Sequence, residues 1–186
     1  EERMQSRQFE LAEESLALMY RAQEVFDFVR NIGSFSNEGT TRTPQGDETD
    51  EEKSARDYNF VPLERLNSEQ EFFKRVIDIR PGIKAIFGED KSAPLDQNLE
   101  LRNKIIIAAR MLSHPRLPHQ FRTDEQYQQH LNRQEEYESV IWKGYAEAVD
   151  TIETDPIDVP LEEAKRQLIE IVGPLINKRL HSANEH

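Results

Sequence analysis

The sequence contains no cysteine, and this absence excludes disulfide scaffolds, cysteine nucleophiles, thiolate zinc sites and iron–sulfur clusters. It has only seven glycines, and the glycine-rich phosphate-binding patterns GxGxxG and GxxxxGK[ST] are both missing. No run of about 18 apolar residues occurs, so we expect no segment of this sequence to span a bilayer, and no signal peptide is visible. Nucleotide binding and thiol chemistry are therefore not expected.

Positive charge is also scarce, because 24 Lys and Arg residues stand against 36 Asp and Glu residues, a formal net charge of −12. This balance argues against a protein that coats nucleic acid, since binding to phosphates needs clustered cations. Hydrophobic residues make up 36% of the 186 residues and charged residues 32%. These fractions favour amphipathic helices with wide solvated faces over a sheet-centred enzyme. We therefore expect a single all-α domain over residues 1–186.

The spacing of apolar residues predicts a long first helix over residues 1–32, followed by a loop over residues 33–60. Steps of three, four or seven separate the apolar residues of the helix, which are Phe9, Ala12, Leu16, Met19, Tyr20, Phe26, Val29 and Ile32. The loop contains three glycines, one proline and an acidic run over residues 47–52, and we expect at most one short helical turn near residues 51–57. Its composition favours disorder, and loops of this length are otherwise usually functional.

The remaining helices are expected within residues 61–181. The second helix begins at Pro62 and breaks or kinks at Pro81, because proline removes a hydrogen bond to the carbonyl four residues earlier. A third helix follows from Ser92 to about Ser113, a fourth from Thr123 to about residue 152 with Trp142 at the margin of its apolar stripe, and a last one from about residue 158. The expected fold is an antiparallel bundle of four or five helices with one long acidic loop.

No arrangement of residues in the sequence points to catalysis. The nucleophile-elbow pattern G-x-S-x-G is absent. Glu-x-x-His pairs that would place a metal in a bundle core are also absent, because Arg116 and Tyr127 stand three residues before His119 and His130. Adjacent carboxylates lie on polar helical faces, where they are solvated. We therefore expect no enzyme activity, no catalytic residue, no metal and no cofactor.

Charge is segregated along the chain, since residues 101–122 contain five cations and no Asp or Glu. We call these cations the basic ridge, and they are Arg102, Lys104, Arg110, Arg116 and Arg122. In one interpretation the basic ridge binds anionic lipid head groups, an acidic protein partner or the chain's own acidic loop. In the other, the cations simply pair with carboxylates on neighbouring helices.

Five segments of the sequence carry a family resemblance. They are LALMYRAQEVFDFVR (residues 16–30), the EG..R element (Glu38, Gly39 and Arg42), FVPLERL (residues 60–66), IFGED (residues 86–90) and IIIAARML (residues 105–112). Over residues 9–145 the chain resembles a group of uncharacterised bacterial proteins in which an amino-terminal membrane-spanning helix precedes a helical soluble domain. The resemblance implies an architecture and no particular activity.

The leading functional hypothesis is a non-enzymatic helical interaction or scaffold domain. The expected location is the cytoplasm, and in one form of the hypothesis a segment upstream of Glu1 holds the domain at the inner face of the membrane. The expected partner is a protein or an anionic membrane surface, not nucleic acid, and self-association through the first helix is a further option. The alternative is a small-ligand sensor whose pocket lies beside the kinks at Pro81 or Pro174.

Overall fold

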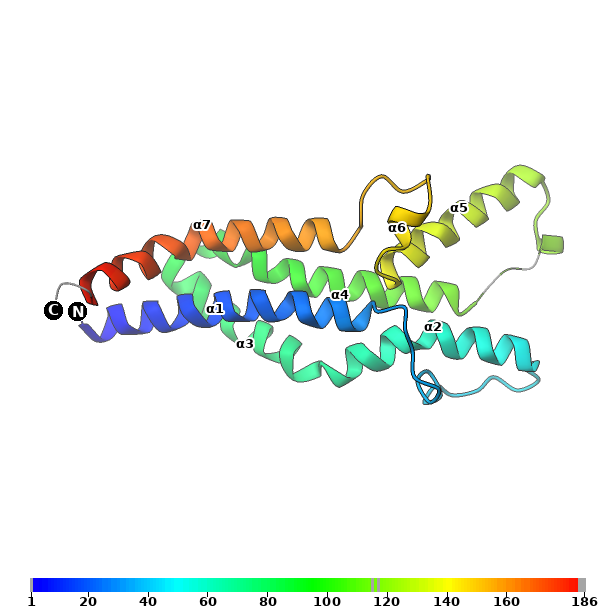
Figure 1. Ribbon diagram of the computed structural model, residues 1–186, viewed down its shortest axis with the longest axis horizontal. Coiled ribbons are helices and arrows are strands. Elements are labelled where there is room, and N and C mark those ends of the chain that lie inside the picture. Colours follow the sequence, from blue (N-terminus) through cyan, green and yellow to red (C-terminus); the bar gives the residue numbers. More distant parts are fainter. Residues whose placement is uncertain (1, 115, 117, 184–186) are drawn as a thin grey trace. The chain divides into compact units, whose positions relative to one another are not determined.

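The computed structural model describes residues 2–114, 116 and 118–183, and these residues form helices and the loops between them. Helices account for 77% of the chain, and no strand occurs among the described residues, so the all-α expectation is confirmed. In chain order (Figure 1), the elements are α1 (Glu2–Val29), α2 (Asp50–Ser68), α3 (Gln70–Phe87), the 3-10 turn η1 (Glu89–Ser92), α4 (Ala93–Leu112), the 3-10 turn η2 (Pro118–Gln120), α5 (Asp124–Ile141), α6 (Tyr145–Ala148) and α7 (Asp158–Ala183).

The described residues group into two compact units. The first unit contains residues 2–25, 69–101 and 158–183, and the second contains Phe26–Ser68 and Arg102–Ile157. Helices α1 and α4 each contribute to both units. The expectation of a single domain over residues 1–186 stays a prediction.

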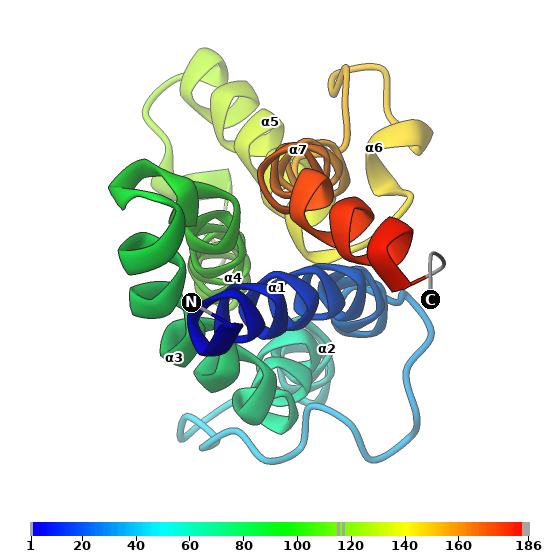
Figure 2. The same ribbon diagram turned by 90° about the vertical axis from the view of Figure 1, so that its left-hand side faces the viewer.

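In the first unit, α1 has α7 along one side and α3 along the other (Figure 1 and Figure 2). Apolar side chains at helical spacing fill the space between these helices, because burying one stripe of each helix removes hydrocarbon from water. The buried apolar residues of this unit are Leu11, Ala12, Met19, Ala22, Val25, Phe72, Phe73, Val76, Ile79, Ile83, Leu95, Leu101, Leu161, Ala164, Leu168 and Val172.

Pro81 does not interrupt α3, so the predicted break at this residue is wrong. Pro81 itself is exposed, whereas Ile79 and Ile83 on either side of it are buried. The neighbouring Gly82 packs against Leu11 of α1 so closely that an added Cβ atom would lie 3.2 Å from a Leu11 methyl carbon. Packing of the flanking residues therefore holds the helix together where the proline removes a hydrogen bond.

The chain instead changes from α2 to α3 around Glu69. The Ser68 hydroxyl donates to the Arg65 carbonyl at 2.7 Å, which takes up an acceptor at the end of α2. The Glu69 carbonyl accepts hydrogen bonds from the amides of Phe72 and Phe73 and so begins α3. The second predicted helix is therefore two helices, which meet at Glu69 and not at the predicted break at Pro81.

Helix α2 begins at Asp50, whereas we predicted a helix start at Pro62 and a loop up to residue 60. Thr49 and Glu52 form a reciprocal capping box, in which the Glu52 amide donates to the Thr49 hydroxyl and the Thr49 amide donates to the Glu52 carboxylate. Three acidic residues occupy the first turn, where the positive end of the helix dipole stabilises them. Pro62 lies buried inside the helix, and residues 50–60 are helical rather than disordered.

The predicted first and fourth helices both end earlier than expected. Helix α1 ends at Val29 instead of residue 32, and Glu1 lies outside the described residues. Helix α5 ends at Ile141 because Trp142 is extended, and Gly144 then takes a left-handed conformation with φ of 82° before the short α6. The Lys143 amide donates to the Arg30 carbonyl at 2.9 Å, so a contact with the end of α1 holds this bend.

Trp142 is buried and not marginal, which corrects the position we predicted for it. Only 3% of its surface is exposed, and its ring lies 4.6 Å from the Tyr58 ring of α2. It belongs to the apolar core of the second unit, which contains Phe26, Val29, Val61, Leu66, Ile105, Ala108, Ala109, Leu112, Val140, Ile141, Trp142, Ala146 and Ile157.

Candidate functional site

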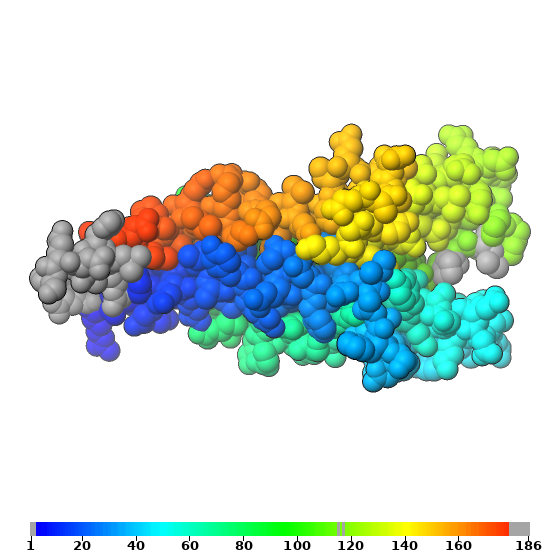
Figure 3. All heavy atoms as spheres, viewed as in Figure 1, coloured from blue at the N-terminus to red at the C-terminus, as the bar shows by residue number. Residues whose placement is uncertain are grey.

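The loop between α1 and α2, residues 30–49, is held to α2 by ionic hydrogen bonds (Figure 3 shows it at the surface beside α2). The first attachment is Arg65, whose guanidinium donates to both carboxylate oxygens of Glu38 at 3.0 and 2.8 Å. Arg65 also donates to the carbonyls of Phe28, Asn31 and Gly33 at 3.1, 2.6 and 2.6 Å. It therefore supplies donors to the carbonyls at and after the end of α1.

The second attachment is the neighbouring Glu64. Its carboxylate accepts hydrogen bonds from the Gly39 amide at 2.6 Å, the Thr41 amide at 2.9 Å and the Thr41 hydroxyl. Burial raises the pKa of Glu64, but these hydrogen bonds outweigh burial and hold the pKa below its ordinary value. Gly39 has φ of 81°, and a Cβ atom there would lie 1.9 Å from the Asp57 carbonyl oxygen, so this close approach requires glycine.

The third attachment is Arg42, which bridges two carboxylates. It donates to Glu48 at 2.8 and 2.7 Å and to Asp57 at 2.5 Å, while Arg56 donates to Glu48 at 2.7 Å. The hydrogen bonds from Arg42, followed by those from Arg56, lower the pKa of Glu48 to about 2. These three attachments give the loop a defined path, in contrast to the disorder that its composition favours.

A second buried arginine, Arg30, joins the end of α1 to the end of α5. It has no exposed surface, and it donates to the carbonyls of Ser139 and Val140 at 2.8 and 2.9 Å and to the Asp155 carboxylate at 2.7 Å. A buried guanidinium is costly unless its donors are satisfied, and here backbone carbonyls share the task with one carboxylate.

Three of the segments from which we expected a family resemblance meet at these arginines. Arg30 ends the first segment, Glu38, Gly39 and Arg42 form the EG..R element, and Glu64 with Arg65 lies in the third segment. Our sequence analysis assigned no site role to Glu38, Glu64, Arg30 or Arg65. The available signal was that Arg30 directly follows Val29 and Arg65 directly precedes Leu66. Both cations thus stand beside a buried apolar residue, where a charged residue is unusual.

The residues of the basic ridge do not form one site. Arg102 and Arg110 line one pocket, Arg122 lines a separate small pocket, and Lys104 and Arg116 are exposed outside both. The Lys104 ammonium donates to the Pro156 carbonyl at 3.4 Å, and the Arg122 amide donates to the Gln126 side chain. The structure thus brings together two of the five predicted residues.

The pocket that contains Arg102 and Arg110 lies in the second unit, between α2 and α4, with one residue of the loop. Its volume is about 280 Å³. The lining residues are Thr41 from the loop, Phe60, Leu63, Glu64, Leu66 and Asn67 from α2, and Arg102, Ile106 and Arg110 from α4.

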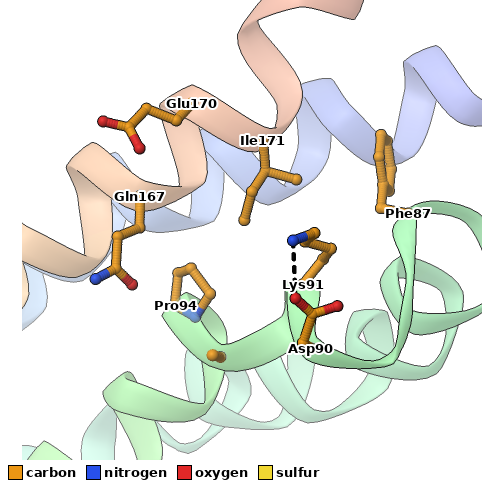
Figure 4. Close-up of a pocket in the computed structure, with 8 residues that line it drawn as sticks. Phe87, Asp90, Lys91, Pro94, Gln167, Glu170 and Ile171 are labelled. Carbon is orange, nitrogen blue, oxygen red and sulfur yellow. Dashed lines mark hydrogen bonds and ion pairs between the residues drawn. The ribbon is translucent and has the colours of Figure 1, made fainter.

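A larger pocket of about 500 Å³ lies in the first unit (Figure 4). Figure 4 shows Ile171 of α7 pointing into it, opposite Lys91 and Pro94. Lys91 pairs with the neighbouring Asp90 at 2.8 Å, so the charge of the cation in this pocket is already balanced. Neither Pro81 nor Pro174 lines this pocket or the one between α2 and α4.

Within the described ranges, no cluster of three or more His, Asp or Glu side chains is arranged to hold a metal ion. None of the helices in the same ranges is long and apolar enough to cross a membrane. No family model matches the sequence, and no curated protein and no solved structure matches it either.

Proposed function

We propose that this chain is a non-enzymatic helical interaction domain that binds an acidic helix of a partner protein through the exposed face of α4. We take the fold to be an antiparallel bundle with four or five principal helices and one acidic loop. The observation that carries the proposal is the exposed apolar pair Ile107 and Met111, which lies beside Lys104 in a stretch without carboxylates.

The exposed face of α4 has the composition of a binding surface. Ile107 is 58% exposed and Met111 is 51% exposed, and one helical turn separates them. Lys104 lies one turn before Ile107, and all three side chains belong to the second unit. An amphipathic helix with apolar residues at the same spacing and carboxylates on its flanks would cover the apolar pair and pair with the cation.

An acidic protein helix suits this face better than an anionic membrane does. Helices that lie in a membrane interface bury a broad apolar stripe, and here the stripe contains two side chains. A membrane tether upstream of residue 1 remains part of the proposal, and the full-length reading frame tests it, since a spanning helix needs about 20 apolar residues.

The test is the binding of a fluorescein-labelled amphipathic Leu/Glu helical peptide, measured by fluorescence anisotropy at low and high salt. The variant is Lys104→Glu with Ile107→Ser. The matched control is Lys74→Glu with Ile77→Ser on α3, where an exposed lysine and an isoleucine that is 47% exposed have the same spacing. We expect the α4 variant to lose affinity roughly tenfold or more and the α3 control to bind like the wild type.

Two results would overturn the proposal. One is peptide binding that the α4 variant does not weaken relative to the α3 control. The other is co-sedimentation of the wild type with phosphatidylserine vesicles, but not of the α4 variant, together with no binding to the peptide, because this result would assign the face to a membrane.

A further inference from the structure

We infer that the pocket between α2 and α4 binds a small organic acid, with the anionic group at Arg110 and the hydrocarbon part against Phe60, Leu63 and Ile106. This site is separate from the exposed pair Ile107 and Met111, which does not line the pocket. The inference therefore does not depend on the proposed interaction with a partner helix.

Two helical faces form the walls of the pocket. Phe60, Leu63 and Asn67 follow one another at steps of three and four along α2, and Arg102, Ile106 and Arg110 at steps of four along α4. The volume of about 280 Å³ lies near the lower end of the range for ligand pockets, which is roughly 300 to 1,000 Å³. The pocket therefore suits a ligand with one or two rings or a short chain.

The chemical class follows from the lining. Phe60, Leu63, Leu66 and Ile106 offer apolar surface, and Arg102 with Arg110 brings two guanidinium groups to the same cavity. Pockets of this type bind an apolar ligand body and orient it with a few polar groups. A guanidinium binds a carboxylate or sulfonate through two parallel hydrogen bonds, which favours an anionic head on the ligand.

The charge of Arg110 is available to such a ligand. Among the described residues, the Arg110 side chain makes no hydrogen bond and no ion pair, whereas the Glu64 carboxylate in the same pocket is engaged by the two amides and the hydroxyl of the loop. The low pKa of Glu64 keeps this carboxylate ionised, so it would repel the ligand's anionic group. The anionic head should therefore be oriented by the arginines, not by Glu64.

The pocket also connects a ligand to the loop between α1 and α2. Thr41 lines the pocket and donates twice to Glu64. A ligand that fills the space beside Thr41 limits the motions that would break these hydrogen bonds, so binding should slow hydrogen exchange of the Gly39 and Thr41 amides. Hydrogen exchange at these two amides therefore reports on binding in this pocket.

The experiment is a calorimetric titration of the protein with 2-naphthoate, and with the neutral 2-naphthamide as the matched ligand. Arg110→Met removes the charge but keeps a long side chain, and Arg116→Met makes the same change at an exposed arginine outside the pocket. We expect Arg110→Met to weaken naphthoate binding about tenfold or more and Arg116→Met to leave it unchanged. Asn67→Trp, which places a large ring over the pocket from an exposed position, should abolish binding.

The inference is overturned if naphthoate and naphthamide bind equally well, because the anionic head would then contribute nothing. It is equally overturned if Arg110→Met and Arg116→Met have the same affinity, or if the wild type shows no binding at millimolar ligand. Slower exchange of the Gly39 and Thr41 amides on adding naphthoate, in the wild type and not in Asn67→Trp, would support it.

Discussion

The two units of the chain differ in the charge that they bury. The buried polar residues described in the first unit, Ser15, Ser92 and Asn98, are neutral, whereas the second unit buries the guanidinium groups of Arg30 and Arg65 in addition to Ser139. The second unit contains the ends of α1 and α5, and carbonyls near these ends have no partner within their own helices. The two arginines donate to those carbonyls. In this unit, buried guanidinium groups therefore satisfy the backbone acceptors of helices that end in its interior.

The largest effect is expected when a buried arginine is removed. Arg30→Met keeps most of the volume but removes the guanidinium that donates to the carbonyls of Ser139 and Val140 and to the Asp155 carboxylate. Loss of one partner of a buried pair typically costs about 3 to 5 kcal/mol of unfolding free energy. Urea denaturation measures this cost. Arg7→Met, at an exposed pair with Glu10, is the control, with an expected cost below about 1 kcal/mol. Similar costs for the two variants would contradict this account of the second unit.

A core truncation probes the apolar side of the comparison. Leu168→Ala removes a fully buried side chain of α7 in the first unit and should lower the unfolding free energy by about 3 kcal/mol, because it leaves a cavity. The neighbouring Ile169 is 40% exposed, so Ile169→Ala should change stability far less. Equal destabilisation by the two substitutions in thermal melts would mean that this unit is not packed as described.

A smaller effect is expected at the start of α2. Thr49→Ala removes the hydroxyl that accepts from the Glu52 amide and should destabilise the protein by about 1 kcal/mol. Thr43→Ala in the same loop serves as the control, since Thr43 is exposed. Hydrogen exchange of the amides in the first turn of α2 should accelerate in the Thr49 variant alone. Unchanged exchange there would show that the capping box does not hold this helix end.

One contribution to the unfolding free energy is expected to depend on pH. The Arg42 hydrogen bonds lower the pKa of Glu48 from 4.5 to about 2, so the ionised group stabilises the folded protein. This contribution is present above about pH 4.5 and is lost as the pH falls towards 2. The difference in unfolding free energy between the wild type and Glu48→Gln should therefore shrink over this range. A difference that is constant with pH would show that Glu48 is not coupled to Arg42.

Much of the helical content was predictable from the sequence, because apolar periodicity is a local signal. The errors at Pro62 and Pro81 have a physical cause, since burial of neighbouring residues outweighs the hydrogen bond that a proline removes. The start of α2 could have been found, because Thr49 and Glu52 have the spacing of a capping box. The acidic composition of the segment concealed this signal.

The candidate site was less predictable than the helices. Arg30 meets Ser139 and Val140 across more than 100 residues of sequence, and no local pattern indicates which carbonyls lack partners. The basic ridge was recognised by charge alone. The placement of Arg102 and Arg110 in one pocket depends on how residues 60–67 face residues 102–110, and helix pairing of this kind is not encoded in either segment by itself.

The way the chain threads through its two units sets an order for folding during synthesis on the ribosome. Every residue of the second unit lies within residues 26–157, so all of its segments are available before α7 has been made. The first unit requires α7, which begins at Asp158 and lies along α1 (Figure 1). Until the ribosome has released α7, the face of α1 that α7 covers stays exposed in the growing chain, and this interval is when chaperones have most to bind.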